Sequence, residues 1–343
     1  MRALGLHEWG GVVKPENRPD PAPGPGEVLV QVLACGIGLT VLNCISGNLG
    51  ADPANLPRIP GHELVGTVLA RGAGVDQPAP GDLVAAYFYL HCGNCRACWR
   101  GEQSCCENFG GYVGVHRDGG YAELVTLPSR NAIALPAGMD PVGATVVPDA
   151  VATPIHIARR AGITSGMRVA VIAACGGVGA HMVQVARLFG AQVAGLEATA
   201  AKLSYLESEL GVVAVDSADF RLARLPAAWR AGADVVVDFL GSHDSFRWSL
   251  DSLAPGGRMV VVTTFPGVTA DLTSRELVLG QKSVIGSRYC GKAEFAEAAD
   301  VVASGQVRPV IGRTADMDSV EEVHGLLRRG ELIGRGALVM AAR

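Results

Sequence analysis

Five of the nine cysteines in this 343-residue chain lie within residues 92–106, in the sequence CGNCRACWRGEQSCC. Cys92, Cys95 and Cys98 form two consecutive C-x-x-C turns, and Cys106 follows after seven intervening residues. Four thiolates on one short loop suit a closed tetrahedral zinc site. Such a site has no open coordination position, so we expect the metal to stabilise the fold of this lobe rather than to take part in catalysis.

Two other interpretations of these cysteines remain open, namely free buried thiols and an iron–sulfur cluster, since thiolate ligands alone do not exclude iron. Cys105 neighbours Cys106 and is interpreted as a spare. The first twenty residues have no long apolar core and no small-residue cleavage site, so they do not form a secretory signal. No apolar run approaches the length that spans a bilayer. We therefore expect a soluble, cytoplasmic protein whose cysteines serve metal or thiol chemistry rather than disulfides.

A second chemical pattern is the glycine-rich sequence ACGGVG at residues 174–179. Gly176 and Gly177 allow the backbone to approach a pyrophosphate, whose charge is favoured at the amino end of the helix that follows Val178. Gly179 allows that helix to pack closely on the preceding strand. A tight strand–helix turn without a ligand is the competing interpretation, but the surrounding pattern favours a dinucleotide site.

The elements that must position this turn alternate along the chain from about residue 151. The apolar run 168–174 predicts a strand buried on both faces. Residues 180–190 have apolar residues at helical spacing and end at Gly190 as a C-terminal cap. Further strands are predicted at 192–197, 233–241, 256–263 and 282–287. This alternation predicts a parallel, doubly wound sheet.

Glu197 ends the second of these strands, about twenty residues beyond the glycine turn. An acidic side chain there accepts hydrogen bonds from the adenosine ribose and repels a 2′-phosphate, which favours NAD over NADP. Lys202 is expected near the same ribose. The competing interpretation of Glu197 is a solvated carboxylate at a strand end.

The composition is that of a well-packed globular protein, with 49% apolar and 18% charged residues. The length fits two domains. A net charge of −4 would not hold a polyanion, so nucleic-acid binding is set aside. The expected ligand besides the coenzyme is a small-molecule substrate.

Together these features resemble the zinc-containing medium-chain alcohol dehydrogenase family over nearly the whole chain. The motifs that carry the resemblance, besides the cysteine lobe and the glycine turn, are PGHELVGTV (60–68), GGYAEL (119–124), PDAVATPIH (148–156), LAPGGRMVVV (253–262) and GELIGRGALVM (330–340). The resemblance implies an α/β protein in which residues 1–150 and 289–343 form a GroES-like catalytic domain. Residues 151–288 would form an inserted Rossmann domain that binds NAD.

In the family, a catalytic zinc is usually held by Cys, His and a third Cys, Asp or Glu. The resemblance assigns the His to His62 and the third ligand to Asp149. The first ligand falls on position 38, which is glycine in this chain and offers no side chain. Glu63 is the candidate substitute ligand. We expect one structural zinc and no catalytic zinc. His62 and Asp149 would then form a hydrogen-bonded pair.

Two further changes fall in the same loop. The family Asp becomes Val41, and the relay His that follows becomes Asn43, which cannot titrate. Thr40, the hydroxyl that would pass the alcohol proton, is retained. The resemblance also places Thr153 at the nicotinamide and Arg335 at the pyrophosphate, and it implies a homodimer or homotetramer.

The sequence therefore predicts an NAD(H)-dependent oxidoreductase that transfers hydride to an activated carbonyl or a conjugated C=C bond without catalytic zinc. Thr40 or His62 would polarise the substrate by hydrogen bonding. One alternative is a zinc-dependent alcohol dehydrogenase that uses Glu63 as a replacement ligand. The other is a nucleotide-binding scaffold without turnover. The substrate itself cannot be read from the sequence, because pocket residues are scattered over loops.

Overall fold

The computed structural model describes residues 1–263, 268–269 and 271–341, and these divide into two compact units. The first unit comprises Met1–Ala152 and Cys290–Arg343, and the second comprises Thr153–Tyr289. The second unit is therefore inserted between the two segments that form the first unit. Among the described residues, no helix combines the length and apolar character needed to cross a membrane.

The first unit is built on a seven-stranded sheet, in which the strands run in the order β14-β15-β3-β4-β5-β7 and β6 pairs with β3. A separate antiparallel pair joins β1 to β2. The strand bounds are β1 Arg2–Gly5, β2 Lys14–Asn17, β3 Glu27–Ile37, β4 Glu63–Arg71, β5 Leu83–Ala86, β6 Leu124–Pro128, β7 Ala132–Ala134, β14 Ile311–Ala315 and β15 Arg335–Val339.

The helices of the first unit are short, and most of them connect strands. They are α1 Leu39–Ile45, α2 Arg96–Trp99, α3 Pro141–Ala144, α9 Lys292–Ala303 and α10 Val320–Arg328, with 3₁₀ turns at Pro53–Asn55, Gln103–Cys105 and Ser129–Asn131. A π-helical turn, η4, spans Val147–Val151, and all five of its residues are buried. Such turns occur mostly as single insertions and often at functional sites.

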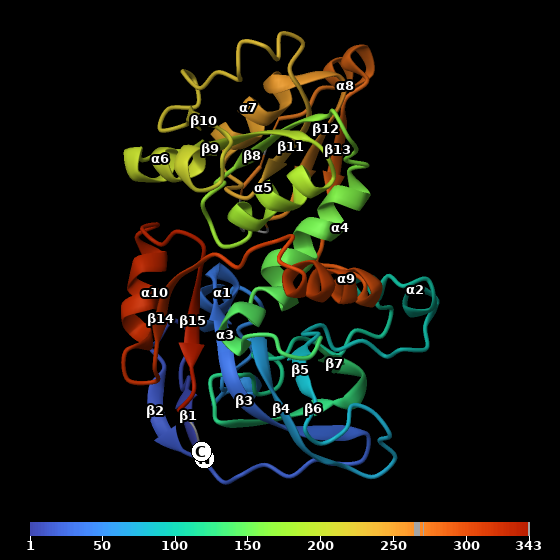
Figure 1. The fold of residues 1–343 in the computed structure, drawn as a ribbon, viewed down its shortest axis with the longest axis vertical. Helices are drawn as coiled ribbons and strands as arrows, with labels where there is room; N and C mark the ends of the chain where they lie inside the picture. Colours follow the sequence, from blue (N-terminus) through green and yellow to red (C-terminus); the bar gives the residue numbers. More distant parts are fainter. Residues whose placement is uncertain (264–267, 270, 342–343) are drawn as a thin grey trace. The chain divides into compact units, whose positions relative to one another are not determined.

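The central strand β3 determines where the site of the first unit forms. It pairs with β4 on one side and with β15 on the other, so that Gly36 lies opposite Glu63 and Ile37 lies opposite Gly336. Figure 1 shows β15 returning beside β3 although the two are far apart in the sequence. The carboxyl end of β3 therefore lies between the first residues of β4 and β15.

The second unit is a six-stranded parallel sheet in the order β10-β9-β8-β11-β12-β13 (Figure 1). Its strands are β8 Arg168–Ile172, β9 Gln192–Glu197, β10 Val213–Asp216, β11 Ala233–Asp238, β12 Leu253–Val261 and β13 Ser283–Gly286, and its helices are α4 Ala152–Arg160, α5 Gly179–Leu188, α6 Ala200–Ser208, α7 His243–Ser252 and α8 Ser274–Gly280. In chain order the strands run 3-2-1-4-5-6, which is the order of a dinucleotide-binding fold. The predicted doubly wound sheet is confirmed.

Three predicted strands are shorter than expected, and β13 loses one residue at each end. β8 ends at Ile172 rather than at residue 174, because Ala173 adopts a positive φ of 56° and turns the chain toward α5. β11 ends at Asp238 rather than at Gly241, since the Asp238 carboxylate accepts hydrogen bonds from the backbone N–H groups of Leu240 and Gly241 and closes a turn. The helix prediction is confirmed, including Gly190, which has a φ of 83° just beyond α5.

Candidate functional site

The first site is the cysteine cluster of the first unit. Cys92, Cys95, Cys98 and Cys106 bring their sulfurs within metal-binding reach of one another. Neighbouring sulfurs lie 3.5–4.0 Å apart, whereas zinc–sulfur bonds of about 2.3 Å would place the sulfurs of a tetrahedral site about 3.8 Å apart. The four thiols therefore suit a closed tetrahedral zinc. Cys105 is exposed, as expected of a spare.

Backbone N–H groups around this cluster point at its sulfurs. The N–H of Cys92 donates to Cys106 Sγ at 3.3 Å, and those of Cys98 and Glu107 donate to Cys95 Sγ at 3.5 and 3.4 Å. Hydrogen bonds to the charged form of a group favour that form. These amides therefore support thiolates, which are the species that bind metal.

The second site is the side-chain cluster at the carboxyl end of β3, where His62, Glu63 and Asp149 offer three ligand atoms within 4.8 Å of one another. Glu63 is fully buried, and His62 and Asp149 are 4% and 8% exposed. β4 begins at Glu63, and Asp149 comes from the buried π-helical turn η4. The structure thus places Asp149 beside His62 and Glu63, which are neighbours in the chain.

The cation in this cluster is Arg335, the first residue of β15, which is 3% exposed. Its Nε donates to Glu63 Oε2 at 3.1 Å, and its Nη2 donates to Glu63 Oε1. Nη2 also donates to Asp149 Oδ2 at 2.7 Å. One guanidinium therefore bridges both carboxylates. The resemblance had placed Arg335 at the pyrophosphate, and its pairing with Glu63 and Asp149 is a contact that the sequence analysis missed.

Two glycines in β3 and just beyond it create the space for this arrangement. A Cβ at Gly36 would lie 2.9 Å from Glu63 Cβ and 3.0 Å from its Cδ. A Cβ at Gly38 would lie 2.5 Å from Arg335 Cζ and 3.0 Å from its Nε. Real Cβ atoms essentially never approach other atoms within 3.0 Å. A side chain at position 38 would therefore require the end of the Arg335 side chain to shift.

The expected hydrogen bond between His62 and Asp149 is wrong. His62 Nε2 lies 3.7 Å from Asp149 Oδ2 and 3.7 Å from Glu63 Oε1, and this buried nitrogen has no hydrogen-bond partner. The reason is that Arg335 already holds the facing oxygens of both carboxylates. The imidazole ring is kept in place by an edge-on contact with Phe88, whose ring centroid lies 4.5 Å away.

The electrostatics of the cluster follow from burial and pairing. Burial raises the pKa of Glu63, although the charges of Arg335 and His62 oppose that shift. Burial penalises the charged guanidinium, but Glu63 and Asp149 together hold the pKa of Arg335 above its ordinary value. The guanidinium therefore remains charged. A buried carboxylate without such a partner would be strongly destabilising.

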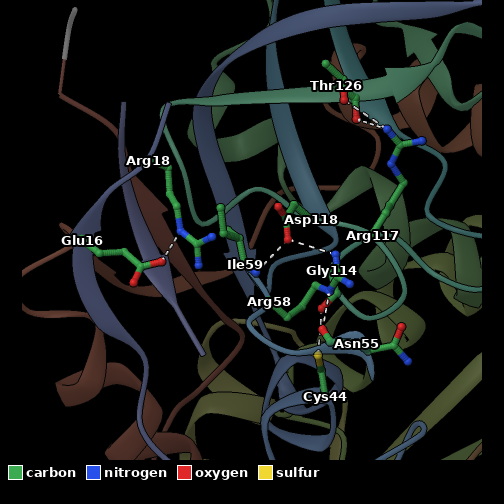
Figure 2. A network of polar contacts seen from close by, with 10 residues as sticks. All are labelled: Glu16, Arg18, Cys44, Asn55, Arg58, Ile59, Gly114, Arg117, Asp118 and Thr126. Atoms are coloured by element: carbon green, nitrogen blue, oxygen red, sulfur yellow. Dashed lines mark hydrogen bonds and ion pairs between the residues drawn. The ribbon is translucent and has the colours of Figure 1, made fainter. Parts of the chain in front are cut away.

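The nearby cysteines do not supply the missing thiolate. Cys35 is fully buried in β3, and burial, with the charge of Glu63, raises the pKa of its thiol well above the ordinary value. Burial raises the pKa of Cys44 to about 12, and its Sγ donates to the carbonyl of Gly114 at 2.8 Å. Figure 2 shows this contact together with the hydrogen bond that Arg58 Nη1 donates to Asp118 Oδ1. Thr40 lies in the first turn of α1 and is half-buried.

The third site is the glycine turn of the second unit. The N–H of Gly176 donates to the carbonyl of Ala173 at 3.0 Å, and α5 begins at Gly179 after Val178 as N-cap. The ring of His181 donates from Nδ1 to the carbonyl of Gly177 at 2.7 Å. His181 is a residue that the sequence analysis missed, and its position four residues after Gly177 was the available signal.

Glu197 is buried and is not a solvated carboxylate, so that competing interpretation is wrong. Its Oε1 accepts a hydrogen bond from the N–H of Cys175 at 2.7 Å, and its Oε2 lies 3.7 Å from Lys202 Nζ. Glu197 thus ties the end of β9 to the glycine turn. Thr153 is buried in α4, within the same unit.

Comparisons with known proteins agree with this architecture. Residues 24–137 match the alcohol dehydrogenase GroES-like domain, and residues 177–304 match the zinc-binding dehydrogenase family. The chain is 29% identical over 317 residues to an acryloyl-coenzyme A reductase of Metallosphaera sedula, covering 92% of this chain and 93% of that protein. It is 30% identical over 339 residues to an alcohol dehydrogenase of Geobacillus stearothermophilus, covering 98% of each.

A solved structure is also similar to this chain over nearly its whole length. The cobalt- and zinc-bound thermostable alcohol dehydrogenase of Pyrobaculum aerophilum superposes with a TM-score of 0.89, at 32% identity and with 99% of each chain covered. The similarity extends over both units of the chain.

A first prediction concerns the cysteine cluster. Cys106→Ser should lose bound zinc and unfold at a temperature lower by at least about 4 °C, because metal binding to such a site contributes to folding. Cys105→Ser is the matched control, since its side chain is exposed and lies next in the chain. Elemental analysis and thermal unfolding measure both effects. Equal zinc content in the two variants would contradict the assignment.

A second prediction concerns the glycine turn. Gly179→Ala should destabilise the chain by about 1–3 kcal/mol, because its Cβ would lie 3.0 Å from Ala174 Cα and against the Ala173 carbonyl. Gly286→Ala is the control, since nothing lies within 4 Å of a Cβ there. Denaturant unfolding measures the difference. Similar stability of both variants would show that the turn has room to relax.

Proposed function

Because the chain belongs to the zinc-binding, medium-chain alcohol dehydrogenase family, we propose that it is an NAD(H)-dependent reductase without a catalytic zinc. It would transfer hydride to an activated carbonyl or to a conjugated C=C bond. The observation that carries the proposal is the bridging of Glu63 and Asp149 by Arg335, beside a glycine at position 38.

The residues present do not fit a catalytic zinc. Such a site needs three protein ligands and one open position. Gly38 offers no ligand, and both oxygens of Glu63 and one of Asp149 accept hydrogen bonds from Arg335. A metal bound at these oxygens would have to displace a buried, permanently charged guanidinium.

Without a metal, substrates that delocalise charge are favoured. Reduction of a simple ketone concentrates negative charge on one oxygen, which a Lewis acid normally stabilises. Hydride addition to the far carbon of a conjugated carbonyl compound spreads that charge over an enolate, and hydrogen-bond donors are then sufficient. The relative named acryloyl-coenzyme A reductase supports this choice of acceptor, because acryloyl is a conjugated acyl group.

Coenzyme choice follows from Glu197. A buried carboxylate that accepts from the N–H of Cys175 stands at the end of β9, where the adenosine ribose of a dinucleotide is recognised. Its charge would repel the 2′-phosphate of NADP, which supports NAD(H).

The specific alternative is a zinc-dependent alcohol dehydrogenase, which is favoured by the three ligand atoms of His62, Glu63 and Asp149. The two functions differ in metal content and in acceptor. A scaffold without turnover would bind NADH but consume none.

A third prediction tests the proposal. The purified chain should contain about one zinc, at the cysteine cluster, and should oxidise NADH with α,β-unsaturated carbonyl compounds faster than with saturated ketones. Metal analysis and absorbance of NADH across a panel of enones, aldehydes and ketones give both quantities. About two zinc ions per chain with oxidation of simple alcohols would support the alternative function instead.

A fourth prediction tests coenzyme choice. Glu197→Gln should lower the KM for NADPH on the order of ten-fold, because the amide still accepts from Cys175 N–H but no longer repels a phosphate, while Lys202 loses its carboxylate partner. Glu207→Gln, on the exposed part of α6, is the control. An unchanged preference between NADH and NADPH would contradict the role of Glu197.

A further inference from the structure

A buried chain of hydrogen-bonding groups links helix α10 to the segment 119–121 of the first unit. The Tyr121 hydroxyl lies 3.0 Å from His324 Nε2, and His324 Nδ1 lies 3.1 Å from Glu321 Oε1. Tyr121 and His324 are fully buried, and their rings are stacked with an interplanar angle of 14°. The Glu321 side chain is 34% exposed and accepts a further hydrogen bond from Arg328. The chain of groups therefore runs from the surface of α10 into the core.

The segment 119–121 in turn holds the strip of backbone directly before His62. Its three N–H groups donate to the three carbonyls of residues 59–61, at 2.8, 2.8 and 3.0 Å. Figure 2 shows the outer end of this strip, where the N–H of Ile59 donates to Asp118 Oδ1 at 3.0 Å. The position of the strip 59–61 therefore depends on that of the segment 119–121.

Gly61 is the point at which the Tyr121 side chain meets this strip. Gly61 has a φ of 98°, and a Cβ there would lie 2.5 Å from Tyr121 Cδ1 and 2.9 Å from Cys35 Sγ. Both atoms belong to fully buried side chains in a close-packed interior, so neither has free space into which it could move. The Tyr121 ring thus sets the position of the residue that precedes His62.

We propose that Tyr121 and His324 are positioning residues for the site of the first unit, and that they hold Gly61, and through it His62, in place only while His324 is neutral. Acidification would then release the strip 59–61. The kinetic part of the test below rests on the proposed function, whereas the part that measures hydrogen exchange does not.

The argument from hydrogen bonding is that a neutral imidazole has one donor and one acceptor. If Nδ1–H of His324 donates to the Glu321 carboxylate, Nε2 is free to accept from the Tyr121 hydroxyl, and every group of the chain is satisfied. In the charged imidazolium both nitrogens are donors, so the Tyr121 O–H loses its acceptor. That hydroxyl makes no other hydrogen bond to a described residue. A buried hydroxyl without an acceptor is unfavourable, and the geometry therefore selects neutral His324.

The groups that act on His324 favour the same form. Burial lowers the pKa of His324, the Glu321 carboxylate opposes that shift, and the charge of Arg328 adds to it. On the other side of the pair, burial raises the pKa of Tyr121 well above its ordinary value, and Cys35 of β3, Glu63 of β4 and Cys44 of α1 act in the same direction. The phenol therefore stays protonated and remains a donor.

The other charged groups on α10 and on the strands beside it are paired with one another. Arg313 of β14 lies 4.0 Å from Glu322, and Arg2 of β1 lies 3.0 Å from Asp318. Glu321 and Arg328 are thus the charged groups that act on His324 among the described residues.

The dependence on pH has a defined sign. His324 has a lower pKa in the closed, folded state than in an opened one, so the opened state takes up a proton first as the pH falls. The stabilisation is complete above the ordinary histidine pKa of about 6.5 and is lost progressively below it. Between about pH 7.5 and about pH 5.5, one such group increases the population of the opened state by up to about ten-fold.

The first arm of the test is amide hydrogen exchange of the intact chain at about pH 7.5 and about pH 5.5, corrected for the intrinsic chemical rate. In the wild type, residues 119–121 should exchange on the order of ten-fold faster at the lower pH. His324→Gln should remove this pH dependence, because its amide oxygen can accept from the phenol but does not titrate. His243→Gln, at an exposed histidine of the second unit, is the matched control and should behave as the wild type. A packing role alone would lower protection equally at both pH values, and a pH dependence retained in His324→Gln would overturn the proposal.

Tyr121→Phe provides a second variant that keeps the ring against Gly61 and removes only the hydroxyl. Residues 119–121 should then exchange on the order of ten-fold faster already at neutral pH, with at most about a two-fold further change on acidification. Tyr205→Phe, in α6 of the second unit, is the control. Wild-type exchange in Tyr121→Phe would contradict the anchoring of this segment by His324.

The second arm measures kcat for NADH oxidation with the best acceptor from the panel over the same pH range. On acidification, kcat of the wild type should fall on the order of ten-fold more than kcat of His324→Gln, because a displaced His62 no longer meets the substrate correctly. The Kd for NADH should change alike in both proteins. Identical acid limbs of the two pH profiles would refute the role at the site. If no acceptor oxidises NADH, the proposed function fails, and the exchange result alone then decides whether Tyr121 and His324 hold the strip 59–61.

Discussion

The ion pairs of Arg335 with Glu63 and Asp149 are the constraint on which the site of the first unit depends. Two carboxylates are held there with almost no exposure, and burial makes such a pair unstable without a cation. A metal or a guanidinium can meet that need. The strand order brings the guanidinium close to Glu63, because the first residues of β4 and β15 lie on either side of the carboxyl end of β3.

This constraint explains why several changes in one loop can coexist with an intact fold. Gly38 offers no side chain, and the end of Arg335 packs against its Cα. Val41 is fully buried in α1, where an unpaired carboxylate would be costly. The neutral thiols of Cys35 and Cys44 fit the same environment, since both are held protonated by burial.

Much of this could be predicted from residue types and spacing. The cysteine cluster is local, so its sequence spacing already fixes its geometry. The glycine turn and the parallel sheet follow from short periodic patterns. The partners of Arg335 could not be predicted in this way, because the strand pairing that brings residue 335 beside residue 63 is a property of the whole sheet. The resemblance even suggested a different partner for Arg335. The hydrogen bond from the N–H of Cys175 to the Glu197 carboxylate could not be predicted either. The position of a residue at the end of a strand does not reveal which way its side chain points.

Both units contain buried carboxylates, and they compensate the negative charge of these groups in different ways. In the second unit, Glu197 carries negative charge next to the glycine turn, where we propose that a pyrophosphate binds. The N–H of Cys175 and the ammonium of Lys202 compensate that charge. In the first unit, the negative charge of Glu63 and Asp149 is compensated by one guanidinium. Compensation by a side chain differs from compensation by a metal in one respect that matters for chemistry. A guanidinium offers N–H donors of fixed direction and cannot acidify a bound alcohol as a Lewis acid does. The reductase that we propose would therefore use such donors to stabilise the charge that arrives with a hydride, rather than to remove a proton from an alcohol.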